Sequence, residues 1–195
     1  MASSRCASER VRHGLAVLAA WLALATASVG AAQPEAASEY ELKAAFLYNF
    51  ARFVEWPDAA LPAGARLTIC VLGSDPFGPV LEETIADKQV AERGLVVRRL
   101  APGEGPGGCH ILFVSAAEEA AFARVVPALA PLRVLTVGEA EDFAERGGMI
   151  QLVTRDRKIR FRINVDAADA AGLRISSQLL RLADVVTRSG AAEDR

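Results

Sequence analysis

Two cysteines and one histidine, Cys70, Cys109 and His110, are the residues of this chain best suited to chemistry. A thiol and an imidazole can act as nucleophile and base, or together as metal ligands. Here no serine or carboxylate stands in a recognisable relation to His110, and these ligands without an HExxH pattern do not complete a metal site. The glycine-rich residues 103–108 lack the Lys-Ser/Thr pair of a phosphate loop. We therefore predict a packed imidazole at His110, no catalytic residue, no metal, no cofactor and no enzymatic activity.

Two groups of polar side chains are candidates for contacts with an anion or an acidic partner. Arg160 and Arg162 alternate with apolar residues, which turns them to the solvent side of a predicted hairpin strand. Arg174 and Ser176 lie where a loop enters a predicted helix, so a guanidinium, a hydroxyl and backbone amides could converge on an anion. The alternatives are a solvated edge strand protected by its charges and a simple helix cap at Ser176. We predict these four residues as ligand or partner contacts.

The charge balance and the N-terminal segment bound the class of protein. Lys+Arg 22 against Asp+Glu 24 in 195 residues gives a net charge of -2, which argues against a nucleic-acid-binding protein. Residues 1–32 run from basic residues through an apolar stretch at 15–27 to small residues, the pattern of a secretory signal peptide. The stretch is shorter than the roughly 20 residues that span a bilayer. We predict cleavage after Ala32, with an uncleaved anchor as the alternative, and a protein not embedded in the membrane.

Export decides what the cysteines can do. Removal of the signal peptide would also remove Cys6 and leave Cys70 and Cys109 in an oxidising compartment, where two thiols can persist as one disulfide. A bridge requires their two strands to be neighbours, and Cys109 begins its strand whereas Cys70 lies midway along its own. Two buried free thiols are the alternative.

The rest of the sequence alternates apolar strands with amphipathic helices. A flexible leader at 33–38 precedes a helix at 39–54, in which the spacing of the aromatic residues indicates a buried face. Trp56, just after this helix, is the aromatic residue least expected to be interior. The elements that follow are a strand at 66–72, a helix at 75–86 with Asp75 as its cap, strands at 95–100 and 109–115, a helix at 116–129, a strand at 134–137 and a helix at 139–145.

The C-terminal part breaks this alternation. Two strands at 149–153 and 159–165 are joined by a polar turn and form a hairpin. Helices at 166–172 and 176–187 and a frayed tail at 189–195 complete the chain. Together the elements predict one α/β domain at 39–188, a three-layer α/β/α sandwich with a mostly parallel sheet and a C-terminal β-hairpin. Its first four strands are expected in the order 2-1-3-4.

Several motifs, in this order and spacing, resemble the YfiR-like family of exported bacterial proteins over residues 39–187. The motifs are KAAFLYNF at 43–50, FVEWP at 53–57, ICVLG at 69–73, CHILFVS at 109–115, GGMI at 147–150, INV at 163–165 and GLRISSQLL at 172–180. The resemblance implies a dimeric periplasmic α/β protein without catalytic activity. It also implies that Cys70 and Cys109 form one of the two disulfides of the family's best-known member, whose second pair has no counterpart near Phe143 and Ile150.

The resemblance implies a function as well. The family's best-known member represses an inner-membrane diguanylate cyclase by contacting the cyclase's periplasmic sensor part, so that cyclic-di-GMP output, biofilm and motility respond to envelope redox state. We therefore predict a periplasmic homodimer that binds the periplasmic domain of such a cyclase. The alternative is a periplasmic binding protein for a small anion or nucleotide, held in a crevice that includes Gly73, Ser74 and Asp75 at the carboxyl ends of the parallel strands.

Overall fold

The computed structural model describes residues 34–187 except 102 and 157. The predicted signal peptide, Arg157 in the polar turn of the predicted hairpin and the predicted tail at 189–195 lie outside the described residues. The described elements are α2 (Pro34–Phe53), β1 (Val54–Glu55), β2 (Leu67–Leu72), α3 (Val80–Ile85), β3 (Gln89–Val90), β4 (Arg93–Leu100), β5 (Ile111–Val114), η1 (Ala116–Glu118), α4 (Glu119–Leu129), η2 (Ala130–Leu132), β6 (Leu135–Gly138), β7 (Ile150–Arg155), β8 (Lys158–Asn164), α5 (Val165–Ala170), β9 (Arg174–Ile175), α6 (Ser177–Leu180) and β10 (Asp184–Val186).

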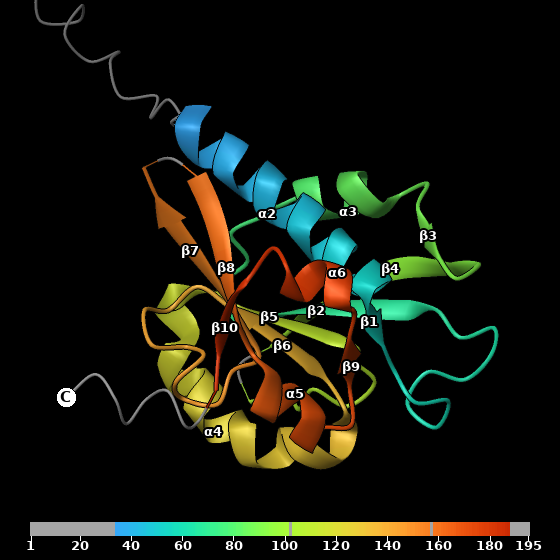
Figure 1. The fold of residues 1–195 in the computed structure, drawn as a ribbon. Coiled ribbons are helices and arrows are strands. Elements are labelled where there is room, and N and C mark those ends of the chain that lie inside the picture. The colour runs from blue at the N-terminus through green and yellow to red at the C-terminus, as the bar shows by residue number, and fades with distance from the viewer. Residues whose placement is uncertain (1–33, 102, 157, 188–195) are drawn as a thin grey trace, which may run out of the picture. The chain divides into compact units, whose positions relative to one another are not determined.

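A curled, mostly parallel sheet in the order β10-β8-β7-β6-β5-β2-β4-β3 forms the centre of the fold (Figure 1). Strands β4, β2, β5 and β6 lie side by side and parallel, which confirms the predicted order 2-1-3-4. The predicted hairpin is also confirmed, because β7 and β8 pair antiparallel from Ile150 and Ile163 to Arg155 and Lys158. A separate two-stranded pair joins β1 to β9.

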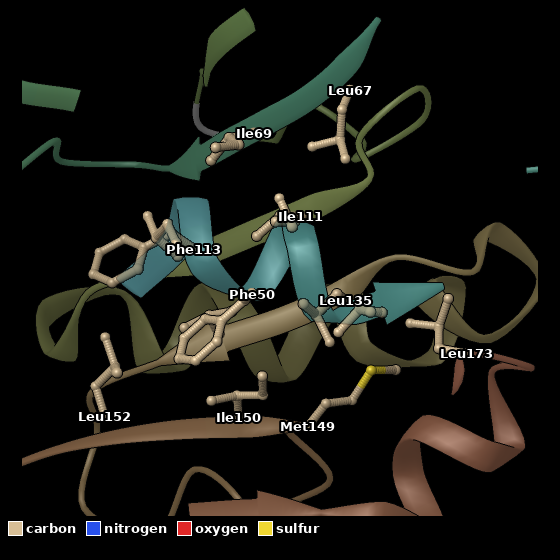
Figure 2. Close-up of a cluster of buried hydrophobic side chains, with 14 of the residues drawn as sticks. Phe50, Leu67, Ile69, Ile111, Phe113, Leu135, Met149, Ile150, Leu152 and Leu173 are labelled. Atoms are coloured by element: carbon tan, nitrogen blue, oxygen red, sulfur yellow. The ribbon is translucent and has the colours of Figure 1, made fainter. Parts of the chain in front are cut away.

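The central strands are buried on both faces, as a three-layer sandwich requires. In β2, Ile69 and Val71 pack into a core that includes α2 and α3, whereas Cys70 and Leu72 pack into a second core on the side of α4. The same alternation continues in β5. Figure 2 shows Phe50 of α2 among the labelled side chains of the first core. The α/β sandwich is therefore observed, with helices on the two faces of the sheet (Figure 1).

Three predicted helices differ from the structure at their starts or in kind. α2 begins at Pro34, so residues 34–38 belong to a helix and not to a flexible leader; proline is well suited to a first helical turn. α3 begins only at Val80, because the Asp75 carboxylate accepts a hydrogen bond from Phe77 N (2.8 Å) within a turn and does not cap the helix. The predicted helix at 139–145 is a series of turns.

Those turns form because Phe143 must reach the second core. Its ring lies over two glycines, and a Cβ added to Gly138 would stand 2.4 Å from the ring. The buried side chain of Gln151 holds the turn by donating to Glu141 O and accepting from Ala144 N. A regular helix would separate these groups, so tertiary contacts override the helical composition of this segment.

The predicted helix at 176–187 is wrong after its first turn. α6 ends at Leu180, and the chain then forms β10, which pairs parallel with β8 so that Val185 faces Ile163. The β-branched Val185 and Val186 favour an extended strand once an open sheet edge is available. Ser176 caps α6, which was the alternative to its predicted contact role, because its Oγ accepts from Leu179 N (3.3 Å).

Candidate functional site

The two cysteines are joined: Cys70 and Cys109 form a disulfide with their Cα atoms 5.8 Å apart. The register partner of Cys70 in β5 is Leu112, so the bridge is not made between opposite residues. It forms because Cys109 precedes β5 in a turn, in which Cys109 N donates to Pro106 O (3.0 Å) and Gly108 has a φ of 77°. Both cysteines are buried, so the bridge fastens two central strands from inside the second core.

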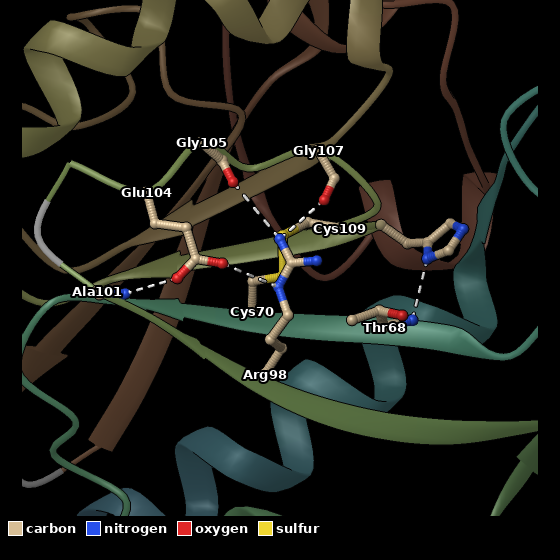
Figure 3. Close-up of a disulfide and its surroundings, with 9 residues drawn as sticks. Thr68, Cys70, Arg98, Ala101, Glu104, Gly105, Gly107 and Cys109 are labelled. Carbon is tan, nitrogen blue, oxygen red and sulfur yellow. Dashed lines mark hydrogen bonds and ion pairs between the residues drawn. A yellow bond between two sulfur atoms is a disulfide. The ribbon is translucent and has the colours of Figure 1, made fainter.

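Arg98 of β4 forms hydrogen bonds with the loop that leads to Cys109. Its Nη2 donates to Gly107 O (2.8 Å) and Gly105 O (3.5 Å) and lies 3.4 Å from the Cys109 sulfur. Its Nε lies 3.9 Å from Glu104 Oε1 (Figure 3). Because one guanidinium holds two carbonyls of the loop, the glycine-rich segment is positioned so that it leads Cys109 to the disulfide.

His110 is a packed imidazole, as predicted. Thr68 N donates to its Nδ1 (3.0 Å), which leaves the proton on Nε2, and Nε2 donates to Ala60 O (3.2 Å). Burial lowers the pKa of His110, so the ring is neutral at physiological pH. Both ring nitrogens are engaged with backbone, and the ring therefore anchors a loop to β2 and is not free to exchange a proton with a substrate.

A buried cation that the sequence reasoning missed lies at the carboxyl ends of β5 and β6. Lys43 of α2 is only 4% exposed, and its ammonium contacts the carboxylates of Glu39 (2.7 Å) and Glu139. Glu139 also accepts from Tyr40 OH (3.2 Å) and Ala116 N (3.2 Å). We call these five residues the Lys43 cluster. It fixes the first half of α2 to the sheet through charge-assisted hydrogen bonds.

The hydrogen bonds of the Lys43 cluster favour the charged forms of Lys43 and Glu39. Burial alone would lower the pKa of Lys43, but its hydrogen bonds to Glu139 and Glu39 outweigh burial and raise it. The hydrogen bond from Lys43 lowers the pKa of Glu39. The sequence signal for this cluster was a lysine four residues after a glutamate on the same helix. Glu139 lies 96 residues from Lys43, so no local pattern pointed to it.

A cleft of about 590 Å³ adjoins the Lys43 cluster, between α2, the β7–β8 hairpin and the loop after β6. Charged side chains of both signs line it, so it suits a polar ligand or a charged partner surface. They are Glu39, Lys43, Glu139, Glu141, Asp142, Arg155 and Arg162. Among the residues described, no group of three or more His, Cys, Asp or Glu side chains is arranged to hold a metal ion.

The structure places the predicted contact residues in two separate groups. Arg160 and Arg162 lie on β8 of the large sheet, where Arg160 is exposed and Arg162 forms an ion pair with Glu145. Arg174 lies on β9 of the small sheet, and Ser176 follows it as the cap of α6. The proximity of Arg174 to Ser176 is therefore observed, and the two pairs belong to different sheets.

Arg174 already has an internal partner. It is the register partner of Glu55 on β1, and both its Nε (3.2 Å) and its Nη2 (2.8 Å) donate to Glu55 Oε2. Both side chains are highly exposed, so this pair is screened by solvent and remains open to competition from an external anion. The prediction of Arg174 and Ser176 as contact residues stays a prediction.

The crevice predicted at Gly73 and Ser74 is filled by the protein itself. The carboxylate of Glu118 accepts from Ser74 N (3.0 Å) at the carboxyl end of β2. A Cβ on Gly73 would come within 2.2 Å of Glu118 Cδ. The position at which an external anion was expected is thus occupied by an internal one.

A comparison with known protein families shows to which family this chain belongs. The sequence profile of the YfiR/HmsC-like family matches residues 40–184, which include every element from α2 to the start of β10. The chain belongs to the YfiR/HmsC-like family. The YfiR/HmsC-like family is a periplasmic family that regulates cyclic-di-GMP signalling, and its role is regulatory rather than catalytic. No curated relative matches the sequence significantly.

Two solved structures match this YfiR/HmsC-like chain, of which the first is similar to it in fold. A conserved domain protein from Vibrio cholerae O1 biovar El Tor has a TM-score of 0.52 at 14% identity, over 76% of this chain and 60% of its own. The ABC domain from Streptococcus pneumonia in complex with L-Trp has a TM-score of 0.47 at 16% identity, over 66% of this chain and 57% of its own. The chain thus spans 60% of the length of the Vibrio cholerae relative. No helix among the described residues is both long and apolar enough to cross a membrane.

Proposed function

We propose that this protein binds the periplasmic sensor part of an inner-membrane diguanylate cyclase, represses the cyclase and so lowers cyclic-di-GMP output. The observation that carries the proposal is the family match over residues 40–184, because that family regulates cyclic-di-GMP signalling from the periplasm. A repressor that acts by docking needs a rigid scaffold and an exposed surface. The disulfide and the Lys43 cluster supply the rigidity.

The proposal assigns docking to the C-terminal edge of the large sheet. Within the described residues β10 pairs only with β8, so its other backbone edge is open to strand addition. Two apolar side chains stand out there, Leu182 at 75% exposed and Val185 at 51% exposed. Exposed Arg160 lies on neighbouring β8 and adds a positive charge. We call Leu182, Val185 and the β10 backbone the β10 edge.

Capture by the cyclase's periplasmic domain tests the proposal. The exported protein should retain that domain on an affinity resin, and the substitutions Leu182→Glu and Val185→Glu should abolish retention because they put charge into an apolar contact. Leu132→Glu is the matched control, since Leu132 is also an exposed apolar residue but lies on η2, outside the β10 edge. All variants should keep the circular dichroism of the parent.

A cellular measurement tests the repression itself. Deletion of the gene should raise cyclic-di-GMP, and the parent and Leu132→Glu proteins should restore the low level, whereas the β10-edge variants should not. An unchanged cyclic-di-GMP level on deletion, with the cyclase present, would contradict repression. If the β10-edge variants restored the low cyclic-di-GMP level fully, the cyclase would have to bind another surface of this protein. The predicted homodimer is part of the proposal and is checked by sedimentation of the exported protein.

A further inference from the structure

A small cavity lies where α2 ends and the chain turns toward β2. Its volume is about 240 Å³, comparable to an amino acid in size. Four stretches line it: the end of α2 with β1, the loop that carries Trp56, the first residue of β2, and the β3–β4 hairpin. The lining residues include Arg52, Val54, Glu55, Trp56, Asp58, Leu61, Leu67, Ala91 and Arg93. We call this space the Trp56 cavity.

Two hydrogen-bond donors in the lining residues lack partners. The indole Nε1 of Trp56 and the Nε of Arg93 are buried, and neither has a hydrogen-bond acceptor within the described part of the chain. A buried donor without an acceptor is unfavourable, because it has given up water without gaining a replacement. Both donors belong to residues that line the same cavity, so a shift of either side chain would turn its donor toward an acceptor held inside it.

The charge of Arg93 is also uncompensated. Its Nη1 donates to Ala91 O at 3.4 Å and its Nη2 to Leu61 O at 3.5 Å, both at the long limit of hydrogen bonding, and no described carboxylate forms an ion pair with it. Because a guanidinium binds carboxylates and phosphates best through paired short bonds, Arg93 retains capacity for an anion.

The other charges of the cavity leave a positive balance. Arg52 stacks over the rings of Tyr48 (5.8 Å) and Phe53 (5.5 Å) and has no carboxylate partner among the described residues. Of the two acidic lining residues, Glu55 is engaged by Arg174, and only the exposed Asp58 opposes the two arginines. The cavity therefore favours an anion over a cation or an uncharged molecule.

The hairpin that carries Arg93 has an unusual backbone. Ala91 and Glu92 form the two-residue turn between β3 and β4, and both have positive φ, 49° and 64°, although neither is glycine. Such a turn is normally made by Asn-Gly or Gly-Gly, and other residues are strained there. Strained backbone that persists beside a cavity is typical of a site where geometry serves binding.

We infer that the Trp56 cavity binds a small anion, with its carboxylate or phosphate oxygens held by Arg93 and the indole N–H of Trp56. The apolar side chains of Val54, Leu61 and Leu67 would cover the remainder of the ligand. The inference concerns the isolated chain, so it does not depend on binding to a cyclase.

Calorimetry and fluorescence on the exported protein test this inference. The probes are small carboxylates from acetate to phenylpropionate, the matching phosphate monoesters and the uncharged amides. A carboxylate or a phosphate ester should bind and raise the melting temperature, and the amide should not. The two anion series distinguish the two kinds of head group. Binding should also change Trp56 fluorescence, and Trp56→Phe should remove that signal.

Two arginine variants locate the site. Arg93→Met should weaken binding about tenfold or more, because hydrogen bonds to charged groups are lost. Arg66→Met is the matched control: Arg66 also donates to a backbone carbonyl, Leu95 O (3.2 Å), but does not line the cavity, and it should bind as the parent does. The inference is overturned if no anion binds the parent, or if Arg93→Met binds like Arg66→Met. If Arg93→Met does not fold, weaker binding by Trp56→Phe decides.

Discussion

Reduction of the Cys70–Cys109 disulfide gives the sharpest test of how this fold is held together. The bridge closes a loop with a sequence separation of 39. In the chain-entropy relation such a loop restricts the unfolded chain enough to stabilise the folded state by about 4 kcal/mol at 25 °C. Reduction adds two hydrogen atoms and removes no atom from the core, so it disturbs the surrounding packing less than a substitution of either cysteine would. The difference between oxidised and reduced protein therefore isolates the effect of the cross-link.

Urea unfolding of the exported protein, with and without reductant, measures this difference. We expect the free energy of unfolding to fall by about 4 kcal/mol on reduction. A domain of this size loses roughly 2–4 °C of melting temperature per kcal/mol of stability. In thermal unfolding, reduction should therefore lower the melting temperature by roughly 8–16 °C. The control is the double variant Cys70→Ala, Cys109→Ala, whose unfolding should be insensitive to reductant. Thiol labelling of the untreated protein should modify neither cysteine.

An equal urea midpoint for oxidised and reduced protein would refute the reasoning. That result would mean that the unfolded chain is already restricted near this loop, or that the reduced state gains compensating contacts. Full labelling of both thiols before reduction would show that the bridge itself does not form. A loss well above 4 kcal/mol would instead indicate that the turn around Gly108 depends on the bridge.

Three further predictions concern the stability contributed by Lys43, Gly138 and His110. Lys43→Met should destabilise the fold by about 3–5 kcal/mol because it leaves buried carboxylate unpaired, whereas Glu39→Gln should cost less than about 1 kcal/mol; chemical denaturation compares the two. Gly138→Ala should cost about 1–3 kcal/mol through its clash with an aromatic ring, and Gly105→Ala, which meets no atom within 4 Å, should be nearly neutral. Because burial lowers the pKa of His110, the unfolded chain takes up a proton below about pH 6.5 that the folded chain resists. Stability should therefore fall as pH drops from 7 to 5, and unfolding curves of His110→Asn should lose this part of the pH dependence.

Much of the architecture could be predicted because the hydrophobic pattern within each central strand indicates that strand and its burial. Continuous apolar runs such as 111–114 indicate strands buried on both faces, and the alternation of Arg160 and Arg162 with apolar residues predicted the hairpin. The packed state of His110 was also predicted, because no residue in the sequence stands where it would make His110 a catalyst. The cap at Ser176 was the alternative to a contact role, and it depends only on neighbours close in sequence.

Residues that depend on distant partners escaped prediction. Lys43 reads as a surface lysine until Glu139 and Tyr40 are brought against it. The cysteine pair was uncertain from spacing alone, since the turn at Gly108 and not the strand register brings the sulfurs together. The Trp56 cavity is likewise formed by four stretches of chain that no sequence pattern links.

The amino-acid sequence by itself determined the layered α/β class, the parallel order of the four central strands and the family, because these follow from hydrophobic periodicity and from motifs that are local in the chain. Only the tertiary structure decided that residues 141–147 are turns, that Val185 and Val186 extend the sheet and that Arg174 is paired. The physical reason is that local propensities differ by less than the free energy of burying Phe143 or of completing a sheet edge.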